Sequence, residues 1–156
     1  MSFRLASAKL TGNPDSSGWA QVHEFKPENP EKLKNRGHLF AVIATQGASV
    51  NLNNVVLGRE ILSRLHEEYF GNQAKDAFNC LKGSLERVSS EFSSLLGNIE
   101  IGAVTFIEKV VYVGAVGGAQ ISLFREGMFA RILVSRKDKV VGQEELSWLL
   151  KSLRMC

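Results

Sequence analysis

The residue types that most often carry chemistry are few in this sequence, and they do not group. Its three histidines, His23, His38 and His66, stand far apart along the chain. A zinc site needs several ligands that converge, and none of these histidines has a second ligand at the i+4 position of a helix. His66 lies near the end of an expected helix, where the helix dipole explains a histidine without any metal. We therefore expect all three to be structural or surface residues.

The aspartates also stand apart. Asp15 lies in a turn-rich segment, Asp76 near a helix start and Asp138 in a loop flanked by lysines, and the sequence has no other aspartate. Acid–base catalysis and two-metal catalysis both need carboxylates held close together. No pair along this sequence is spaced for that work, so we expect no catalytic residue and no metal or other cofactor.

Sequence motifs for nucleotide binding or hydrolysis are missing as well. The chain has no Walker A loop, no GxSxG elbow, no HExxH helix and no GxGxxG turn after a strand. The glycine-rich run at residues 114–118 lies between expected strands and not before a helix. It therefore lacks the free N–H groups with which a helix start binds phosphate, and it indicates a bend in a sheet.

Composition and cysteine usage exclude several classes of protein. A chain of 156 residues that is 44% hydrophobic can bury a core as one domain. A net charge of +3 from scattered basic residues is too small for a nucleic-acid-binding stripe. Cys80 falls on an apolar helix face and Cys156 is terminal, so neither forms a metal or disulfide pattern. No stretch approaches the ~20 apolar residues that span a bilayer, and we expect a cytoplasmic protein without nucleic-acid or membrane partners.

Apolar periodicity predicts the elements that must position any site. Alternation over residues 19–25 predicts a half-buried strand, and the continuous apolar run at 39–44 predicts a strand buried on both faces. Residues 26–38 and 45–49 are polar and predict loops. The remaining elements are expected at helices 53–71, 74–95 and 143–153 and at strands 99–107, 110–116, 120–125 and 128–134. Glu108-Lys109 and Glu126-Gly127 are expected to be hairpin turns. This order predicts one α+β domain over residues 1–156.

Two segments in this order resemble the metal-dependent protein phosphatases of type 2C. The first, at residues 37–48, is an apolar strand that runs into the place of an Asp-Gly-x-Gly-Gly turn, and a long helix follows. The second, at residues 102–127, has a glycine-led strand, a Tyr-Val strand, the place of a Gly-Asp-Ser-Arg turn, and a strand ending in a charged residue and glycine. Two long helices separate the segments, as in the family. The match covers most of residues 3–140 and corresponds to the first half of the family domain.

The resemblance implies a fold and a site. The implied fold is an antiparallel β-sandwich flanked by helices, here truncated, with a two-metal site at one end. In active members, aspartates hold two Mg²⁺ or Mn²⁺ ions that activate a water for attack on phosphoserine or phosphothreonine. Here Ala44 and Thr45 stand at the Asp-Gly of the first turn, and Gly118 and Gln120 stand at the Asp and Arg of the second. An acidic motif expected near the N-terminus falls loosely at residues 18–20, which carry no carboxylate.

These replacements predict a module that has kept the family fold and lost the chemistry. Alanine and glycine offer no anionic oxygen to a metal, and glutamine cannot replace a bidentate guanidinium. We expect a pseudophosphatase-like signalling module without catalytic activity that acts through a protein partner. The family domain continues beyond this length, so the chain is either a fragment or a naturally short version. A shortened sandwich leaves strand edges and a core face uncovered. The final helix, with its leucine stripe, either covers part of that gap or pairs with another copy, and we expect a homodimer.

Two other interpretations stay open. The chain could be an active Mg- or Mn-dependent serine/threonine phosphatase with a rearranged or incomplete site. Alternatively, the resemblance could be misleading, and the chain would be an unrelated α+β domain, because a fold does not fix a function.

Overall fold

The computed structural model describes residues 6–10, 18–48, 53–71, 76–107 and 110–134. These residues form an α+β fold with three helices, a four-stranded antiparallel sheet and a two-stranded sheet, which confirms the predicted class. In chain order the elements are β1 (Gly18–Phe25), α1 (Pro30–Arg36), β2 (His38–Ala48), α2 (Asn54–Gly71), α3 (Ala77–Phe92), β3 (Leu96–Ile107), β4 (Val110–Val116), β5 (Gln120–Arg125) and β6 (Met128–Val134).

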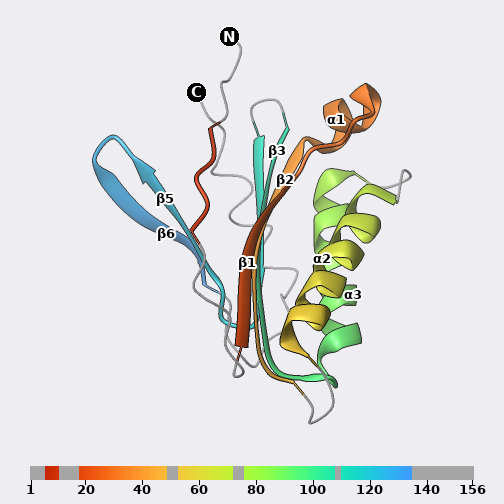
Figure 1. The fold of residues 1–156 in the computed structure, drawn as a ribbon. Coiled ribbons are helices and arrows are strands. Elements are labelled where there is room, and N and C mark those ends of the chain that lie inside the picture. The colour runs from red at the N-terminus through yellow and green to blue at the C-terminus, as the bar shows by residue number, and fades with distance from the viewer. Residues whose placement is uncertain (1–5, 11–17, 49–52, 72–75, 108–109, 135–156) are drawn as a thin grey trace.

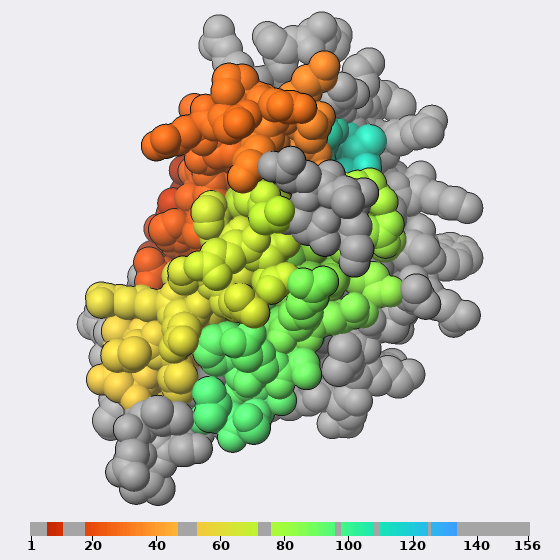
Figure 2. Space-filling model, turned by 90° about the vertical axis from the view of Figure 1, so that its right-hand side faces the viewer, coloured from red at the N-terminus to blue at the C-terminus, as the bar shows by residue number. Residues whose placement is uncertain are grey.

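The larger sheet has the strand order β1-β2-β3-β4, so each strand pairs with its neighbour in the sequence of strands. Helices α2 and α3 cover one face of this sheet, and the β5–β6 hairpin lies on its other side (Figure 1). Viewed from the helix side, α2 and α3 fill the face and α1 lies at one end of it (Figure 2). On the side of the larger sheet away from the helices, the described part of the chain forms one further sheet, and it has only the two strands of this hairpin.

Strand β2 shows how the two faces of the sheet differ. Leu39, Ala41 and Ile43 alternate along it and are buried on the helix side. Val42, which points to the other side, is 52% exposed. The prediction that the apolar run at 39–44 is buried on both faces was therefore wrong, because the second face is open to solvent at Val42.

Two predicted loops contain regular structure. Helix α1 begins after Asn29, whose side-chain oxygen accepts hydrogen bonds from the backbone N–H of Glu31 (2.8 Å) and Lys32 (3.2 Å). It ends before Gly37, which has a φ of 66°. Residues 45–48 continue strand β2: Thr45 and Gln46 pair with both β1 and β3, and Ala48 pairs with β3. Polar composition at these places concealed a capped helix and a strand end.

The two long helices begin and end near the predicted positions. Helix α2 begins after Asn53, whose side chain accepts from the N–H of Val55 at 2.8 Å, and it ends at the predicted Gly71. Helix α3 is capped by Asp76, whose carboxylate accepts from the N–H of Asn79 at 3.0 Å. This hydrogen bond is the main cause that lowers the pKa of Asp76. Helix α3 ends at Phe92, three residues before the predicted end.

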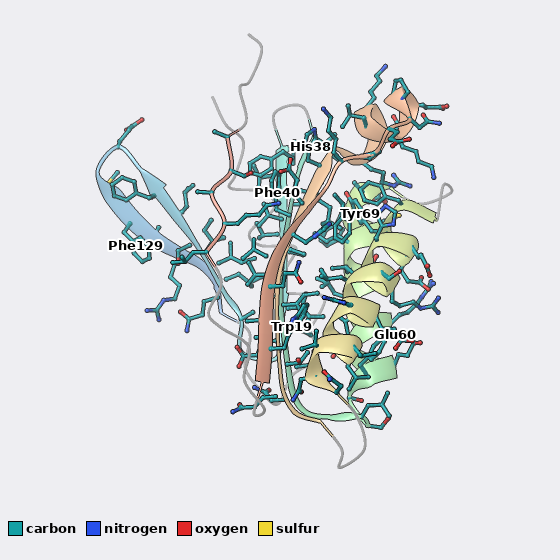
Figure 3. All side chains as sticks on the ribbon, in the orientation of Figure 1. Trp19, His38, Phe40, Glu60, Tyr69 and Phe129 are labelled. Atoms are coloured by element: carbon teal, nitrogen blue, oxygen red, sulfur yellow. The ribbon has the colours of Figure 1, made fainter. Side chains whose placement is uncertain are left out.

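Close contacts fix the helices on the sheet. A Cβ atom at Gly58 of α2 would lie 2.0 Å from Cε3 of Trp19, so the helix lies directly against the indole of β1. A Cβ atom at Gly114 of β4 would lie 2.4 Å from a methyl carbon of Leu85 on α3. Figure 3 shows Trp19 and Tyr69 between the sheet and the helices. The helix-covered face therefore depends on glycine at two crossing points, one under each long helix.

A buried polar cluster joins α1, α2 and β3. The hydroxyls of Tyr69 and Thr105 lie 2.8 Å and 2.7 Å from the carbonyl oxygen of Arg36 and 3.2 Å from each other. A carbonyl oxygen has two lone pairs and can accept from both hydroxyls. Burial raises the pKa of Tyr69 to about 12. The two hydroxyls thus provide hydrogen bonds to the last carbonyl oxygen of α1, which lies inside the core.

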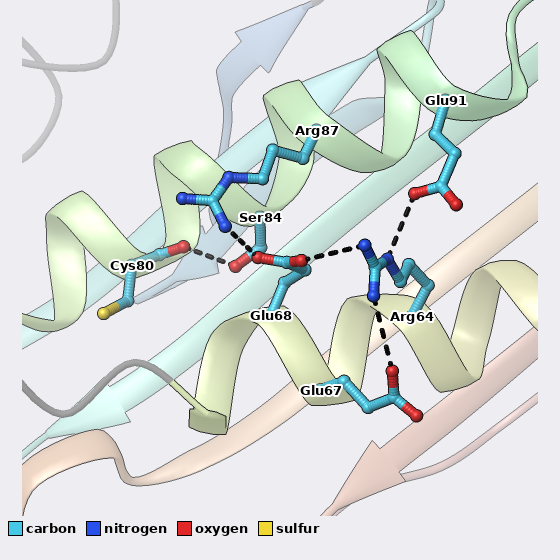
Figure 4. Close-up of polar contacts among 7 residues, drawn as sticks. All are labelled: Arg64, Glu67, Glu68, Cys80, Ser84, Arg87 and Glu91. Atoms are coloured by element: carbon cyan, nitrogen blue, oxygen red, sulfur yellow. Dashed lines mark hydrogen bonds and ion pairs between the residues drawn. The ribbon is translucent and has the colours of Figure 1, made fainter.

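The outer surface of α2 and α3 carries a network of ion pairs (Figure 4). The guanidinium of Arg64 lies 3.1 Å from Glu91, 3.3 Å from Glu68 and 3.6 Å from Glu67. Glu68 also pairs with Arg87 of α3. These contacts bridge the two helices on the side remote from the sheet, where Glu68 is largely covered and the other four charged side chains remain open to solvent.

The smaller sheet is a twisted hairpin. Its two-residue turn is the predicted Glu126-Gly127, with φ values of 52° and 78°. Both residues lie in the left-handed region, which matches the right-handed twist of the flanking strands. The predicted turn at 108–109 and the predicted helix at 143–153 lie outside the described residues.

Candidate functional site

Strand pairing places the positions from the first predicted turn in one row across the sheet. Ala44 of β2 pairs with Ala20 of β1 on one side and with Glu100 of β3 on the other. Thr45, the next residue, pairs with Trp19 and Ile99. The loosely assigned segment at 18–20 therefore lies directly beside the Ala44–Thr45 position, although the two are far apart in sequence.

The second predicted turn lies at the same end of the sheet. Gly117 and Gly118, with φ values of 72° and 108°, connect β4 to β5. A Cβ atom at Gly117 would lie 1.7 Å from the carbonyl oxygen of Ile99, the residue that pairs with Thr45. Ala44 and Thr45 lie within strand β2 and not in a turn, and strand β3 lies between them and the turn at Gly117 and Gly118. Gln120 begins β5 and is exposed.

The side chains in this row divide between the two faces of the sheet. Thr45 is buried on the helix side, with its hydroxyl 3.5 Å from the backbone oxygen of Asn54 at the start of α2. Ala20, Ala44 and Glu100 lie on the helix-free side, because they alternate with Trp19, Thr45 and Ile99. We name these three residues together with Gly118 the sheet-end site.

Glu100 supplies the single carboxylate of the sheet-end site. It is half-buried, and one of its oxygens accepts a hydrogen bond from the side-chain amide of Asn98 at 3.1 Å. Sequence reasoning missed Glu100 because the resembling part of this strand begins only at Gly102, so the resemblance gave Glu100 no role. Its one available signal is a charged residue between two buried isoleucines, Ile99 and Ile101, which marks a position that faces away from the core.

This set of groups is poor in metal ligands. Two divalent ions need several anionic oxygens at fixed positions, and Ala20, Ala44 and Gly118 provide no side-chain oxygen. Among the residues that the structure describes, no three His, Cys, Asp or Glu side chains gather in a way that could hold a metal ion. The sheet-end site can offer one carboxylate and neighbouring amides for hydrogen bonding.

The histidines lie elsewhere. His23 and His66 lie against Phe25, with ring centroids 4.4 Å and 5.0 Å from its ring, and burial is the main cause that lowers the pKa of both. His38 lies 3.0 Å from a carboxylate oxygen of Glu24, and this hydrogen bond lowers the pKa of Glu24. Each of the three histidines thus packs on a ring or hydrogen-bonds a carboxylate of strand β1.

The remaining candidate residues have simple positions. Cys80 is buried on α3, as predicted from its apolar helix face. Asp15, Asp138 and Cys156 lie outside the described residues. No helix in the described ranges has the length and apolar character needed to cross a membrane.

Comparisons with known proteins leave the resemblance to type 2C phosphatases as a prediction from the sequence. No family model, no curated protein and no solved structure matches this chain.

Proposed function

We propose that this chain is a non-catalytic, pseudophosphatase-like module that acts by contact with another protein. The observation that carries the proposal is the composition of the sheet-end site. Positions that stand where the type 2C family has two metal-binding turns lie on either side of strand β3, and Glu100 is the one carboxylate of the sheet-end site. Such a site has a place for the family chemistry but lacks the groups that perform it.

The chemical argument concerns the attacking water. Metal ions lower the pKa of a bound water so that hydroxide forms near neutral pH. A single carboxylate cannot hold two dications, so no such hydroxide would form beside Glu100. Gln120, which stands where the family has arginine, could donate one hydrogen bond to a phosphate but would not neutralise its charge.

The element order supports a scaffold of the phosphatase type. Two long helices are inserted between β2 and β3, and both cover the same face of the antiparallel sheet. The β5–β6 hairpin lies on the opposite side, where a second sheet of a sandwich would be. With its helices on one side and its strands on the other, the chain follows the layer order that the resemblance implies.

The direct test is Mn²⁺-dependent hydrolysis of a phosphothreonine peptide by the full 156-residue chain. We expect no rate above that of Mn²⁺ alone, while an active type 2C phosphatase in the same assay reports that the conditions are adequate. Hydrolysis that is abolished in Glu100→Gln would contradict the proposal and favour an active phosphatase with a rearranged site. Hydrolysis that Glu100→Gln leaves unchanged and that persists through repurification would also contradict the proposal, and the catalytic acids would then lie elsewhere in the chain.

A second test addresses the geometry of the sheet-end site. In Ala44→Asp the new carboxylate would stand directly across the strand from Glu100, and like charges in this position repel. We expect the variant to have a lower Tm than the wild type and to regain it when Mn²⁺ is added. Ala44→Asn is the matched control and should show no such metal dependence. If Mn²⁺ leaves the Tm of Ala44→Asp unchanged, the site cannot gather ligands and the phosphatase-type scaffold is in doubt.

A further inference from the structure

The tip of the β5–β6 hairpin exposes four large apolar side chains. Phe124 and Phe129 are each 70% exposed, Met128 is 68% exposed and Leu123 is 37% exposed. Figure 1 shows the hairpin projecting away from the larger sheet, and Figure 3 shows Phe129 on it, remote from the helices. We name these four residues the hairpin patch.

The strand register divides the hairpin patch between two faces. Phe124 and Phe129 are direct cross-strand partners, so they lie side by side on one face with the exposed Arg131. Leu123 and Met128 lie on the opposite face, because side chains alternate along a strand. A ribbon with apolar side chains on both faces is unusual for a part of the chain that reaches into solvent.

Only the base of the hairpin is anchored in the core. Leu133 is buried against Val113 and Ala115 of β4, and Ile121 packs there in part. Within the described residues, neither β5 nor β6 has a strand along its outer edge. Two-stranded ribbons are marginally stable by themselves, and open edges pair readily with other strands. The tip is therefore the part of the fold that gains most from a partner.

We propose that the hairpin is a dimerisation arm, and that the hairpins of two copies of this chain coil around each other through the hairpin patch. The proposal names a contact surface for a protein-interaction module, but it does not rest on the absence of catalysis and can fail or hold independently. The hydrolysis assay does not test whether the hairpins dimerise, and the dimerisation experiment below does not test whether the chain lacks catalytic activity.

The patch is complementary to a second copy of itself. Antiparallel hairpins related by a two-fold axis would stack Phe124 and Phe129 of one copy on the same residues of the other, an isologous contact. In that arrangement the tip of one hairpin overlies the base of the other. Arg131 of each copy then approaches Glu126 of the other, so that opposite charges meet. Because a two-stranded ribbon twists strongly, a partner that coils around it also reaches Leu123 and Met128.

The area of the patch sets the strength that we expect. Two phenylalanines at this exposure present about 280 Å² of side-chain surface, and the four residues together about 500 Å². Two copies would then bury about 1,000 Å² in total, which is near the lower limit for a specific interface. We therefore expect a weak dimer with a dissociation constant on the order of 10 µM.

Sedimentation equilibrium of the full chain between about 1 and 300 µM tests the proposal around the expected dissociation constant. The weight-average mass should rise with concentration from 17.2 kDa toward twice that value. Phe129→Lys and Phe129→Glu should each weaken association at least tenfold, because each places like charges at the two-fold axis. Val56→Lys is the matched control: Val56 is 60% exposed on α2, and this variant should dimerise like the wild type.

Mixing the two charged variants gives the decisive result. Phe129→Lys and Phe129→Glu together should form a heterodimer that neither forms alone, and this recovery excludes misfolding as the reason for lost association. A wild-type chain that stays monomeric at the highest concentration overturns the proposal. So does a dimer that is insensitive to both substitutions. A monomer whose Tm falls sharply in Phe129→Lys also overturns it, and would show that the patch is covered within one chain.

Discussion

The two faces of the four-stranded sheet differ in how fully they are covered. On the helix side, Ile43, Leu65 and Leu85 are completely buried between the sheet and the two long helices. On the other side, the hairpin covers β3 and β4 near Gly102 and Val113 but leaves the side chains of β2 partly open to solvent. The helix side of the sheet is therefore a complete core, whereas the hairpin side is still partly exposed to solvent.

Because of this difference, we expect the helix-covered face to determine the stability of the fold and the hairpin side to determine its association with other chains. The helix side depends on shape, since two glycines allow the helices to approach the strands closely. The hairpin side depends on exposed apolar side chains, whose removal leaves no cavity. Substitutions on the first face should therefore change the free energy of unfolding, and substitutions on the second should change association.

The largest contrast is expected between Leu85→Ala and Phe129→Ala. Leu85 is fully buried against Gly114, and truncating such a leucine should cost about 3–4 kcal/mol through lost contacts and the cavity left behind. Phe129 is exposed, and its truncation should cost less than about 1 kcal/mol at a concentration where the chain is monomeric. Urea denaturation at 1–2 µM protein, a range set by the expected dimer strength, measures both. Equal costs would abolish the contrast between the faces.

The second contrast uses one substitution at two helix glycines. Gly58→Ala should cost about 2–3 kcal/mol, because the new methyl group would overlap the ring of Trp19 and force α2 away from β1. Gly83→Ala on α3 meets no atom within 4 Å and should stabilise the fold by about 0.5–1 kcal/mol through helix propensity. Opposite signs in the same denaturation assay support the close approach of α2. A neutral Gly58→Ala would show that this contact is loose.

The third prediction concerns alkaline pH. Burial raises the pKa of Tyr69 from 10.0, the value of a free tyrosine side chain, to about 12. The unfolded chain therefore releases this proton first, and stability that is fully present below pH 10 is lost as the pH rises toward 12. The loss at pH 11.5 should reach about 2 kcal/mol. Tyr69→Phe removes this dependence, and a wild-type stability that stays flat between pH 9 and 11.5 would contradict the buried cluster.

The smallest effect should come from the ion pairs on the outer surface of the helices. Glu68→Gln removes contacts with both Arg64 and Arg87, whereas Glu86→Gln removes one long contact, 3.8 Å from Lys82. Glu68 itself is largely covered, but both of its arginine partners are open to solvent, and pairs open to solvent contribute little and are screened by salt. We expect a slightly lower Tm for Glu68→Gln, less change for Glu86→Gln, and no difference between them at about 1 M NaCl. A difference that persists in high salt would point to a structural role for Glu68 beyond its charge.

The long helices and the final hairpin could be predicted from sequence because their signals are local. Apolar spacing predicted α2 and α3, and Glu126-Gly127 predicted the turn. Helix α1 was missed because its seven residues carry no apolar stripe, although Asn29 and Pro30 form a normal helix start. The end of β2 was missed because Thr45 and Gln46 are polar, and their strand character comes from pairing on both sides.

The sheet-end site could be predicted only in part. The resemblance singled out Ala44, Thr45, Gly118 and Gln120, but it could not say that Glu100 stands next to Ala44. That neighbour is defined by strand register between segments separated by two helices, and register depends on packing across the whole sheet. The exposed hairpin patch was not predicted either. Alternation of apolar and polar residues shows which side chains share a face of a strand, but not how far another part of the fold covers that face.

The pairing of β2 with β3 has a consequence for the order in which the molecule assembles. Ala48 pairs with Leu96, yet both long helices lie between them in the chain. Closing so long a loop is entropically unfavourable unless the intervening segment is already compact. We expect α2 and α3 to dock on each other before the central strands meet, so that Leu85→Ala slows refolding in stopped-flow experiments while Phe129→Ala leaves the refolding rate unchanged. Docking of the two helices would then hold two separately formed hairpins, β1–β2 and β3–β4, close enough for β2 and β3 to pair into one sheet.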